Sequence, residues 1–170
     1  MTSLLTSLLS SDWKSTIKKL LLWAIIPLVA WYISLNWYQL MLIQGSSMEP
    51  AYHHLQLVVL NKNDRQFLHG DVVAFWSESL SCVLVKRIVA IPGDTVTICD
   101  GTLFVNDSVS KIYDESVVFS YAGILDNKIT LREGEYLALG DNTEESKDCR
   151  YPEVGIISET EIYGRVGFRR

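Results

Sequence analysis

The sequence has few of the residues that build disulfide frameworks, metal centres and histidine-based catalytic sites. Its 170 residues include only three cysteines and three histidines. An odd number of cysteines leaves at least one thiol unpaired, and the spacing of Cys82, Cys99 and Cys149 matches no zinc or redox motif. We therefore expect three free thiols, no metal and no cofactor, while the residues leave a Cys82–Cys99 disulfide open as the alternative.

The three histidines also provide no obvious base for a catalytic triad. His53 and His54 are adjacent, so an extended backbone would direct their side chains to opposite faces. His69 precedes a Gly-Asp turn, and none of the three is flanked by residues that resemble triad partners. We expect all three on the surface.

Positive charge is scarce as well. The net charge of −5 argues against a nucleic acid as partner. Residues 1–43 carry one aspartate and three lysines, a net charge of +2, so the total of −5 leaves −7 for residues 44–170. A basic segment before an acidic domain is typical of a protein that crosses a membrane once.

Only one long apolar run is present. Residues 20–43 form a stretch of 24 residues without a charge. As a helix this stretch would be about 36 Å long, enough to cross a hydrocarbon core of about 30 Å. We predict a cytoplasmic segment at 1–19, a transmembrane anchor at 20–43 and a domain at 44–170 on the far side, because the lysines precede the anchor.

Two alternatives to this anchor remain open. Aromatic residues gather in its second half, so part of 36–43 could lie outside the hydrocarbon core as a strand. A cleaved signal peptide would share the basic start, but the apolar run is too long and no small-x-small cleavage site ends it.

Residues 44–170 contain many short apolar runs separated by turns, with no repeat and no long helical period. The strongest hairpin signal is Asp100-Gly101. We predict strands at residues 55–61, 70–76, 81–91, 95–99, 102–105, 136–139 and 162–168. This pattern predicts a mostly β, barrel-like or sandwich domain. Residues 106–134 are interpreted as a small insertion, with 111–127 as an excursion from the core.

Two residues in this domain suggest nucleophilic chemistry. Ser47 follows the apolar run almost directly, and a serine hydroxyl needs a neighbouring base to become a nucleophile. Lys86 lies within a run of apolar residues, where burial would lower its pKa from about 10.4 by about 3–5 units. We predict Ser47 as the nucleophile and Lys86 as its base. Alternatively, Lys86 extends to solvent from a strand edge or pairs with an acid.

Four motifs carry a resemblance to a known family. In chain order they are Ser47-Met48-Glu49-Pro50, residues 70–75, residues 86–94, and Gly140-Asp141-Asn142 with residues 146–150. Together they resemble the type I signal peptidases, membrane-bound Ser–Lys endopeptidases that remove signal peptides from exported proteins. The resemblance implies a signal-peptidase-like β-barrel or sandwich after one transmembrane helix. The short chain is similar to the compact Gram-positive type, while relatives of the endoplasmic reticulum type have histidine in place of Lys86.

The resemblance also implies roles for individual residues. Ser47 would attack the scissile carbonyl, Lys86 would carry the proton, and the Ser146 hydroxyl would hold the lysine amine. The backbone N–H of Ser47 would bind the oxyanion, but Gly45 stands where some relatives supply a hydroxyl, which leaves a second donor unidentified. A supporting ion-pair network is expected from Arg87, Asp141, Asp148 and Arg150.

The substrates implied are signal peptides of exported preproteins, cut at the lipid bilayer after small residues in an Ala-x-Ala-like pattern. An extended peptide would lie between residues 42–44 and strand 83–85. The side chains expected to line shallow apolar pockets there are Ile43, Met48, Leu84 and Val85. The bacterial plasma membrane is the expected location, with the catalytic domain extracytoplasmic.

Two functional alternatives accompany this interpretation. A mitochondrial inner-membrane peptidase would perform the same chemistry in another compartment. A membrane-anchored β-domain without catalysis would bind partners only, but the joint presence of Ser47, Lys86 and Ser146 argues against it.

Overall fold

A computed structural model describes residues 2–114 and 116–167. The chain divides into two units, Met1–Tyr38 and Gln39–Arg170. The first unit is the helix α1 (Thr2–Trp37), within which Ser15–Trp37 is long and apolar enough to cross a membrane. Consecutive side chains from Leu20 to Trp23 are all exposed. Because successive residues of a helix point about 100° apart, apolar side chains surround this helix, as in a membrane-spanning segment.

Helix α1 ends before the predicted anchor does. Residues 38–42 form the strand β1 (Tyr38–Leu42), so the last part of the predicted segment 20–43 is not helical. Strand β1 corresponds to the alternative given for residues 36–43, in which part of the aromatic-rich end of the run forms a strand outside the hydrocarbon core. Near the helix end, the Asn36 side-chain amide donates a hydrogen bond of 2.7 Å to the carbonyl of Tyr32. A side chain that donates to a helix carbonyl in this way competes with the backbone N–H that would otherwise donate to the same carbonyl.

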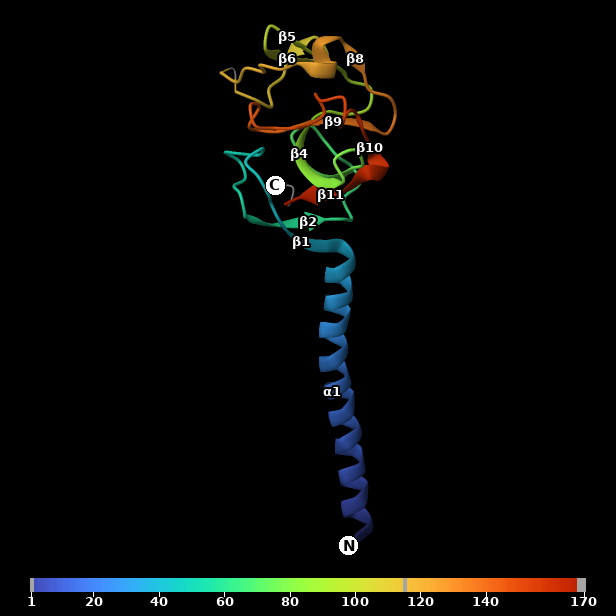
Figure 1. The fold of residues 1–170 in the computed structure, drawn as a ribbon. Coiled ribbons are helices and arrows are strands. Elements are labelled where there is room, and N and C mark those ends of the chain that lie inside the picture. Colours follow the sequence, from blue (N-terminus) through green and yellow to red (C-terminus); the bar gives the residue numbers. More distant parts are fainter. Residues whose placement is uncertain (1, 115, 168–170) are drawn as a thin grey trace. The chain divides into compact units, whose positions relative to one another are not determined.

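The second unit contains two antiparallel sheets (Figure 1). The larger has the strand order β1-β2-β11-β3-β4-β9-β10. Its remaining strands are β2 (Leu57–Asn61), β3 (Val72–Ser77), β4 (Cys82–Ala90), β9 (Glu135–Leu139), β10 (Ile157–Ser158) and β11 (Ile162–Val166). The smaller sheet has the order β7-β6-β5-β8, with β5 (Thr95–Cys99), β6 (Thr102–Val105), β7 (Ser108–Val109) and β8 (Ile129–Thr130). Two 3-10 helices, η1 (Gly123–Asp126) and η2 (Glu159–Glu161), complete the unit.

The mostly β prediction is confirmed. All seven predicted strands occur, with ends that differ by at most two residues, although Phe168 of the last one lies outside the described residues. At the hairpin turn, Asp100 and Gly101 both have positive φ, as its sequence predicts. The sequence missed β7, β8 and β10 because strands of two residues are too short to show alternation.

Hydrophobic clusters lie on both faces of the larger sheet. In β3, Val73 and Phe75 belong to one cluster, which also contains residues of the smaller sheet. Val72 and Ala74 alternate with them and belong to a second cluster with Met48. A strand buried on both faces has a continuous apolar sequence, which explains why β3 shows no polar alternation.

The segment 111–127, which we expected to be an excursion, contributes to the main core. Phe119 and Leu125 are buried there, with exposed fractions of 4% and 0%. Among the residues of this segment that the structure describes, only η1 is regular, so the sequence shows no period that would reveal this packing. The cysteines are all free, with Cys149 buried, which confirms the prediction of three free thiols.

Close backbone packing at Gly164 generates a stability prediction. Gly164 lies in β11, between β2 and β3, and a Cβ atom there would lie 2.2 Å from the backbone oxygen of Asn61. We expect Gly164→Ala to lower stability by about 1–3 kcal/mol, because β2 must move away. Circular dichroism in detergent should then record a thermal midpoint several degrees below that of the wild type.

Gly134→Ala provides the control for this substitution. Its Cβ would meet no atom within 4 Å, and φ at Gly134 is +73°. The control should therefore lower the stability only by the strain of placing alanine in a left-handed backbone conformation, about 1 kcal/mol. A Gly164→Ala midpoint equal to that of the wild type would show that β2 yields without cost.

Candidate active site

The structure brings Ser47 and Lys86 into direct contact. Ser47 lies in a turn after β1 that is closed by a hydrogen bond of 3.0 Å from the Glu49 N–H to the Ser46 carbonyl. Lys86 lies within β4, and its Nζ is 2.6 Å from Ser47 Oγ. The two residues predicted to act as nucleophile and base therefore meet, although 39 positions separate them in the sequence.

The Lys86 side chain is almost fully buried, with an exposed fraction of 3%. This desolvation is the largest influence on its pKa, which it lowers from 10.5 to about 8. The negative charges of Asp148 and Asp141 act in the opposite direction, and the positive charge of Arg150 reinforces the decrease. Near pH 8, much of the Lys86 amine is therefore neutral and able to accept a proton.

Hydrogen bonds hold the turn that contains Ser47, the predicted nucleophile, on both sides. The Asn142 N–H donates to the Ser47 carbonyl at 3.1 Å, and the Asn142 side chain donates to the Ser46 carbonyl at 3.4 Å. The Gly45 N–H donates to His54 Nδ1 at 2.9 Å. Within the described residues, the Ser47 N–H donates no hydrogen bond. That N–H is therefore available to a ligand.

One ion pair fixes the backbone beside Lys86. Arg87 donates to both carboxylate oxygens of Asp141, at 2.7 Å and 2.5 Å, and to the carbonyl of Gly70 at 2.9 Å. Two-pronged contacts of this kind fix orientation as well as distance. Arg87 thereby ties β4 to the loop that contains Asn142.

A second ion pair closes that loop on itself. Asp148 and Arg150 are both buried, and Arg150 binds the two Asp148 oxygens at 2.9 Å and 3.0 Å. Asp148 also accepts from the Gly140 N–H at 2.9 Å, and Arg150 donates to the Thr143 carbonyl at 2.8 Å. The four predicted supporting residues thus form two separate ion pairs on either side of Gly140, and not one continuous network.

Ser146 does not make the contact that the resemblance implies. Its hydroxyl is buried and has no hydrogen-bond partner among the described residues. It lies instead against Gly140, where an added Cβ would be 2.1 Å from Ser146 Oγ. The hydroxyl occupies space that the missing side chain of Gly140 leaves open, and within the described residues the Lys86 amine donates a hydrogen bond to Ser47 alone.

The four predicted pocket residues line one cavity together with Ser47 and Lys86. The cavity has a volume of about 370 Å³ and lies between residues 39–44 and 82–86; Ile43, Met48, Leu84 and Val85 are all part of its wall. In β4, pairing with β9 begins only at Arg87, whereas residues 82–86 pair with β3 alone. Within the described residues, this part of β4 therefore has a free edge that an extended peptide could join.

Sequence reasoning missed several contacts of the site. The Tyr113 hydroxyl donates to the Gly140 carbonyl at 3.2 Å, and the Tyr121 carbonyl accepts from Arg150 at 3.3 Å. A Cβ at Gly123 would lie 2.0 Å from the Arg150 carbonyl oxygen, which shows how closely this segment packs on the site. No periodicity marks these residues, and only the folded chain reveals their partners.

The histidines are on the surface, as expected, but two of them have specific partners. His54 accepts the Gly45 N–H, and His69 Nε2 lies 2.6 Å from a carboxylate oxygen of Asp94. Within the described residues, none of the three forms a hydrogen bond with Ser47 or Lys86. Lys86, and not a histidine, is therefore the basic side chain that the structure places on Ser47.

The chain is similar to several known proteins. A family model described as signal peptidase, peptidase S26, matches residues 14–170. The signal peptidase I of Bacillus licheniformis is 31% identical over 138 residues, which cover 75% of this chain and 73% of the relative. Signal peptidase I U of Bacillus subtilis (strain 168) is 29% identical over 162 residues, which cover 89% and 86%. The crystal structure of a signal peptidase I from Enterococcus faecalis V583 has 24% identity and a TM-score of 0.49, and the match covers 60% of this chain and 97% of that one. Because the family model matches most of its length, the chain belongs to the signal peptidase family, peptidase S26.

Proposed function

We propose that this chain is a signal peptidase I, a serine endopeptidase that removes N-terminal signal peptides from exported preproteins with Ser47 and Lys86. The observation that carries the proposal is the 2.6 Å contact between Lys86 Nζ and Ser47 Oγ, made by a buried lysine whose pKa is lowered to about 8. Membership of the peptidase S26 family and the signal peptidase I relatives support the reaction class.

The proposed chemistry begins with a neutral Lys86 amine. It accepts the Ser47 hydroxyl proton while Oγ attacks the carbonyl carbon of the scissile bond. The unbonded Ser47 N–H stabilises the oxyanion that forms. The Lys86 ammonium then protonates the leaving amine, and an ester remains on Ser47. A water molecule, deprotonated by Lys86, hydrolyses the ester and releases the signal peptide with a free carboxylate.

The cavity beside the dyad suggests how the signal peptide binds. Residues before the cut would pair with the free edge of β4 at residues 82–86, opposite β1. Ile43 and Met48, with exposed fractions of 3% and 1%, would form the bottom of the cavity. Alternate side chains of the peptide would point into this shallow space, which supports a preference for small residues such as alanine at the first and third positions before the cut.

The proposed location is the bacterial plasma membrane. Ser15–Trp37 is the candidate span, and Lys18 and Lys19 lie near its start, which favours a cytoplasmic N-terminus. The domain that follows would then be extracytoplasmic, at the membrane surface where signal peptides emerge. The Bacillus relatives support a bacterial setting.

Substitution of the two reacting residues tests the mechanism. Ser47→Ala and Lys86→Arg should each lower peptide turnover by at least about 10³-fold, and the double variant should be little worse, because the two residues act as one unit. Arginine keeps the positive charge but stays protonated and cannot act as a base. Ser46→Ala is the matched control and should keep most activity, since the hydrogen bonds of Ser46 in the described part of the chain go to its backbone carbonyl and not to its hydroxyl. Near wild-type turnover by Lys86→Arg would overturn the mechanism.

The pH dependence of turnover provides an independent test. Because only the deprotonated Lys86 amine works, kcat/KM should rise with pH and level off above the lowered pKa of about 8. Ser146→Ala should reduce turnover less than either dyad substitution, since this hydroxyl is not a reacting group. The measurement is a profile of kcat/KM against pH for an Ala-x-Ala peptide. A flat profile between about pH 6 and pH 10 would exclude a lysine base.

Tyr113 should position the loop that holds Ser47. Tyr113→Phe removes the donor to the buried Gly140 carbonyl, and an unsatisfied buried carbonyl costs about 1–3 kcal/mol. We expect the loop with Asn142 to shift, so that kcat falls on the order of tenfold with little change in KM. Tyr121→Phe is the matched control, because Tyr121 contacts Arg150 through its backbone carbonyl alone. An unchanged kcat in Tyr113→Phe, or equal losses in both variants, would contradict this role.

A further inference from the structure

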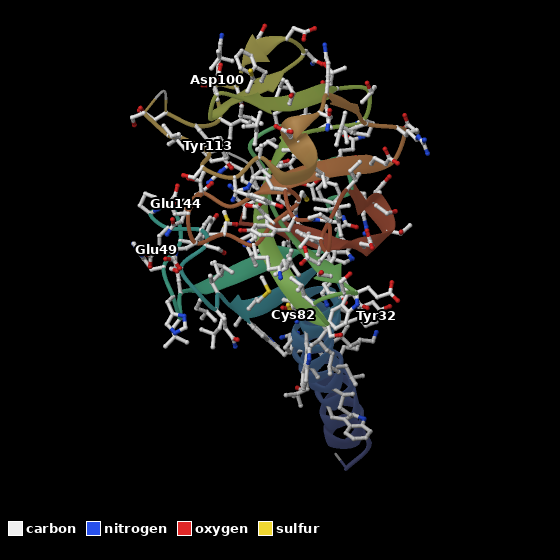
Figure 2. All side chains as sticks on the ribbon, turned by 45° about the horizontal axis from the view of Figure 1, so that its top comes forward. Tyr32, Glu49, Cys82, Asp100, Tyr113 and Glu144 are labelled. Atoms are coloured by element: carbon white, nitrogen blue, oxygen red, sulfur yellow. The ribbon has the colours of Figure 1, made fainter. Side chains whose placement is uncertain are left out.

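A second hollow lies beyond the nucleophile turn. It has a volume of about 560 Å³ and is lined by residues 49–50, 116–118 and 141–144. The dyad cavity includes Ser47 and the adjacent Met48, and the second hollow begins at Glu49, so the same turn borders both without a shared residue. Figure 2 shows Glu49 and Glu144 near each other on one side of the unit, apart from Cys82 at the dyad cavity.

Hydrogen bonds hold the walls of this hollow to each other and to the nucleophile. The Asn142 N–H donates to the Ser47 carbonyl, which fixes one wall to the reacting residue. The Ser120 hydroxyl donates to Glu144 at 2.6 Å, and the Thr143 hydroxyl donates to the Val118 carbonyl at 3.3 Å. The hollow is therefore a defined part of the fold, built where residues 116–120 pack on the loop after Gly140.

In the binding mode proposed above, the residues before the cut occupy the dyad cavity. The residues after the cut then continue past Ser47, and the turn that contains Ser47 also borders the second hollow. From the position of the second hollow we propose that it receives the first residues after the scissile bond, the start of the mature protein. This inference rests on the proposed function and adds a specificity determinant to it.

The charge of the hollow indicates which residues it favours. No lysine or arginine is among its described lining residues. Asp141 is paired with Arg87. Among the described residues, Glu144 accepts a hydrogen bond from the neutral Ser120 hydroxyl alone, and the one ion-pair partner of Glu49 is the exposed His53, at 3.8 Å. In this part of the chain the two glutamates thus have no lysine or arginine partner. The hollow should favour lysine or arginine in the first positions after the cut and disfavour aspartate and glutamate.

Three matched peptides test this preference with the full-length wild-type protein in detergent. They share an Ala-x-Ala sequence and the first residue after the cut, and carry Lys-Lys, Gln-Gln or Glu-Glu at the second and third. We expect kcat/KM to decrease in that order, by about three- to tenfold between the extremes at low ionic strength. The difference should shrink at about 0.5 M salt, where charges on the surface are screened within a few ångströms.

The ratio of kcat/KM for the Lys-Lys peptide to kcat/KM for the Glu-Glu peptide is then measured in two variants. Glu144→Gln should bring the ratio closer to one. Glu133→Gln makes the same change in net charge at an exposed residue outside both hollows, so its ratio should match that of the wild type. Equal kcat/KM for the three peptides, or an equal effect of both variants, would overturn the inference alone. Failure to cleave any of the peptides would overturn the proposed function and this inference with it.

Discussion

The site depends on the desolvation of one side-chain amine, that of Lys86. Lys86 must be buried to lose its proton near pH 8, yet Asp141 and Asp148 lie close enough to raise its pKa. Each of these carboxylates is paired with an arginine, Arg87 for the first and Arg150 for the second. An unpaired carboxylate at this depth would stabilise the ammonium form. The two ion pairs therefore help to keep the Lys86 pKa low, so that the amine can be neutral near pH 8, and they also fix the backbone around the lysine strand.

Much of this arrangement could be predicted from the sequence because it follows from local patterns. Short apolar runs bounded by turns located seven strands, and a lysine within one such run identified Lys86. The motif that contains Ser47 follows the apolar run 20–43 almost directly in the sequence, so its place near a membrane surface was an inference from order alone. Residues predicted to line the substrate pocket, such as Ile43 and Leu84, surround one cavity because they lie close in the chain to the two residues predicted to react.

The remainder depends on contacts between distant segments that have no period of their own. Tyr113 reaches Gly140 from an irregular stretch, and nothing in its sequence neighbourhood marks it as part of the site. The second hollow arises only where three segments meet. For Ser146 the position was predicted but the contact was not. A motif match located it beside the site, but the direction of its hydroxyl depends on the space at Gly140, which a motif does not describe.

The free edge of β4 has a consequence for how the protein behaves at high concentration. Exposed strand edges invite pairing with other chains, and folded proteins usually block them with prolines, charged side chains or covering loops. Residues 82–86 have no such protection, since Val83 is exposed and the lysine in this stretch is turned into the interior. An edge that must stay open to extended peptides is equally open to unfolded or aggregating chains. At high concentration we therefore expect residues 82–86, the stretch proposed to bind substrate, to be a place where copies of the chain pair with one another.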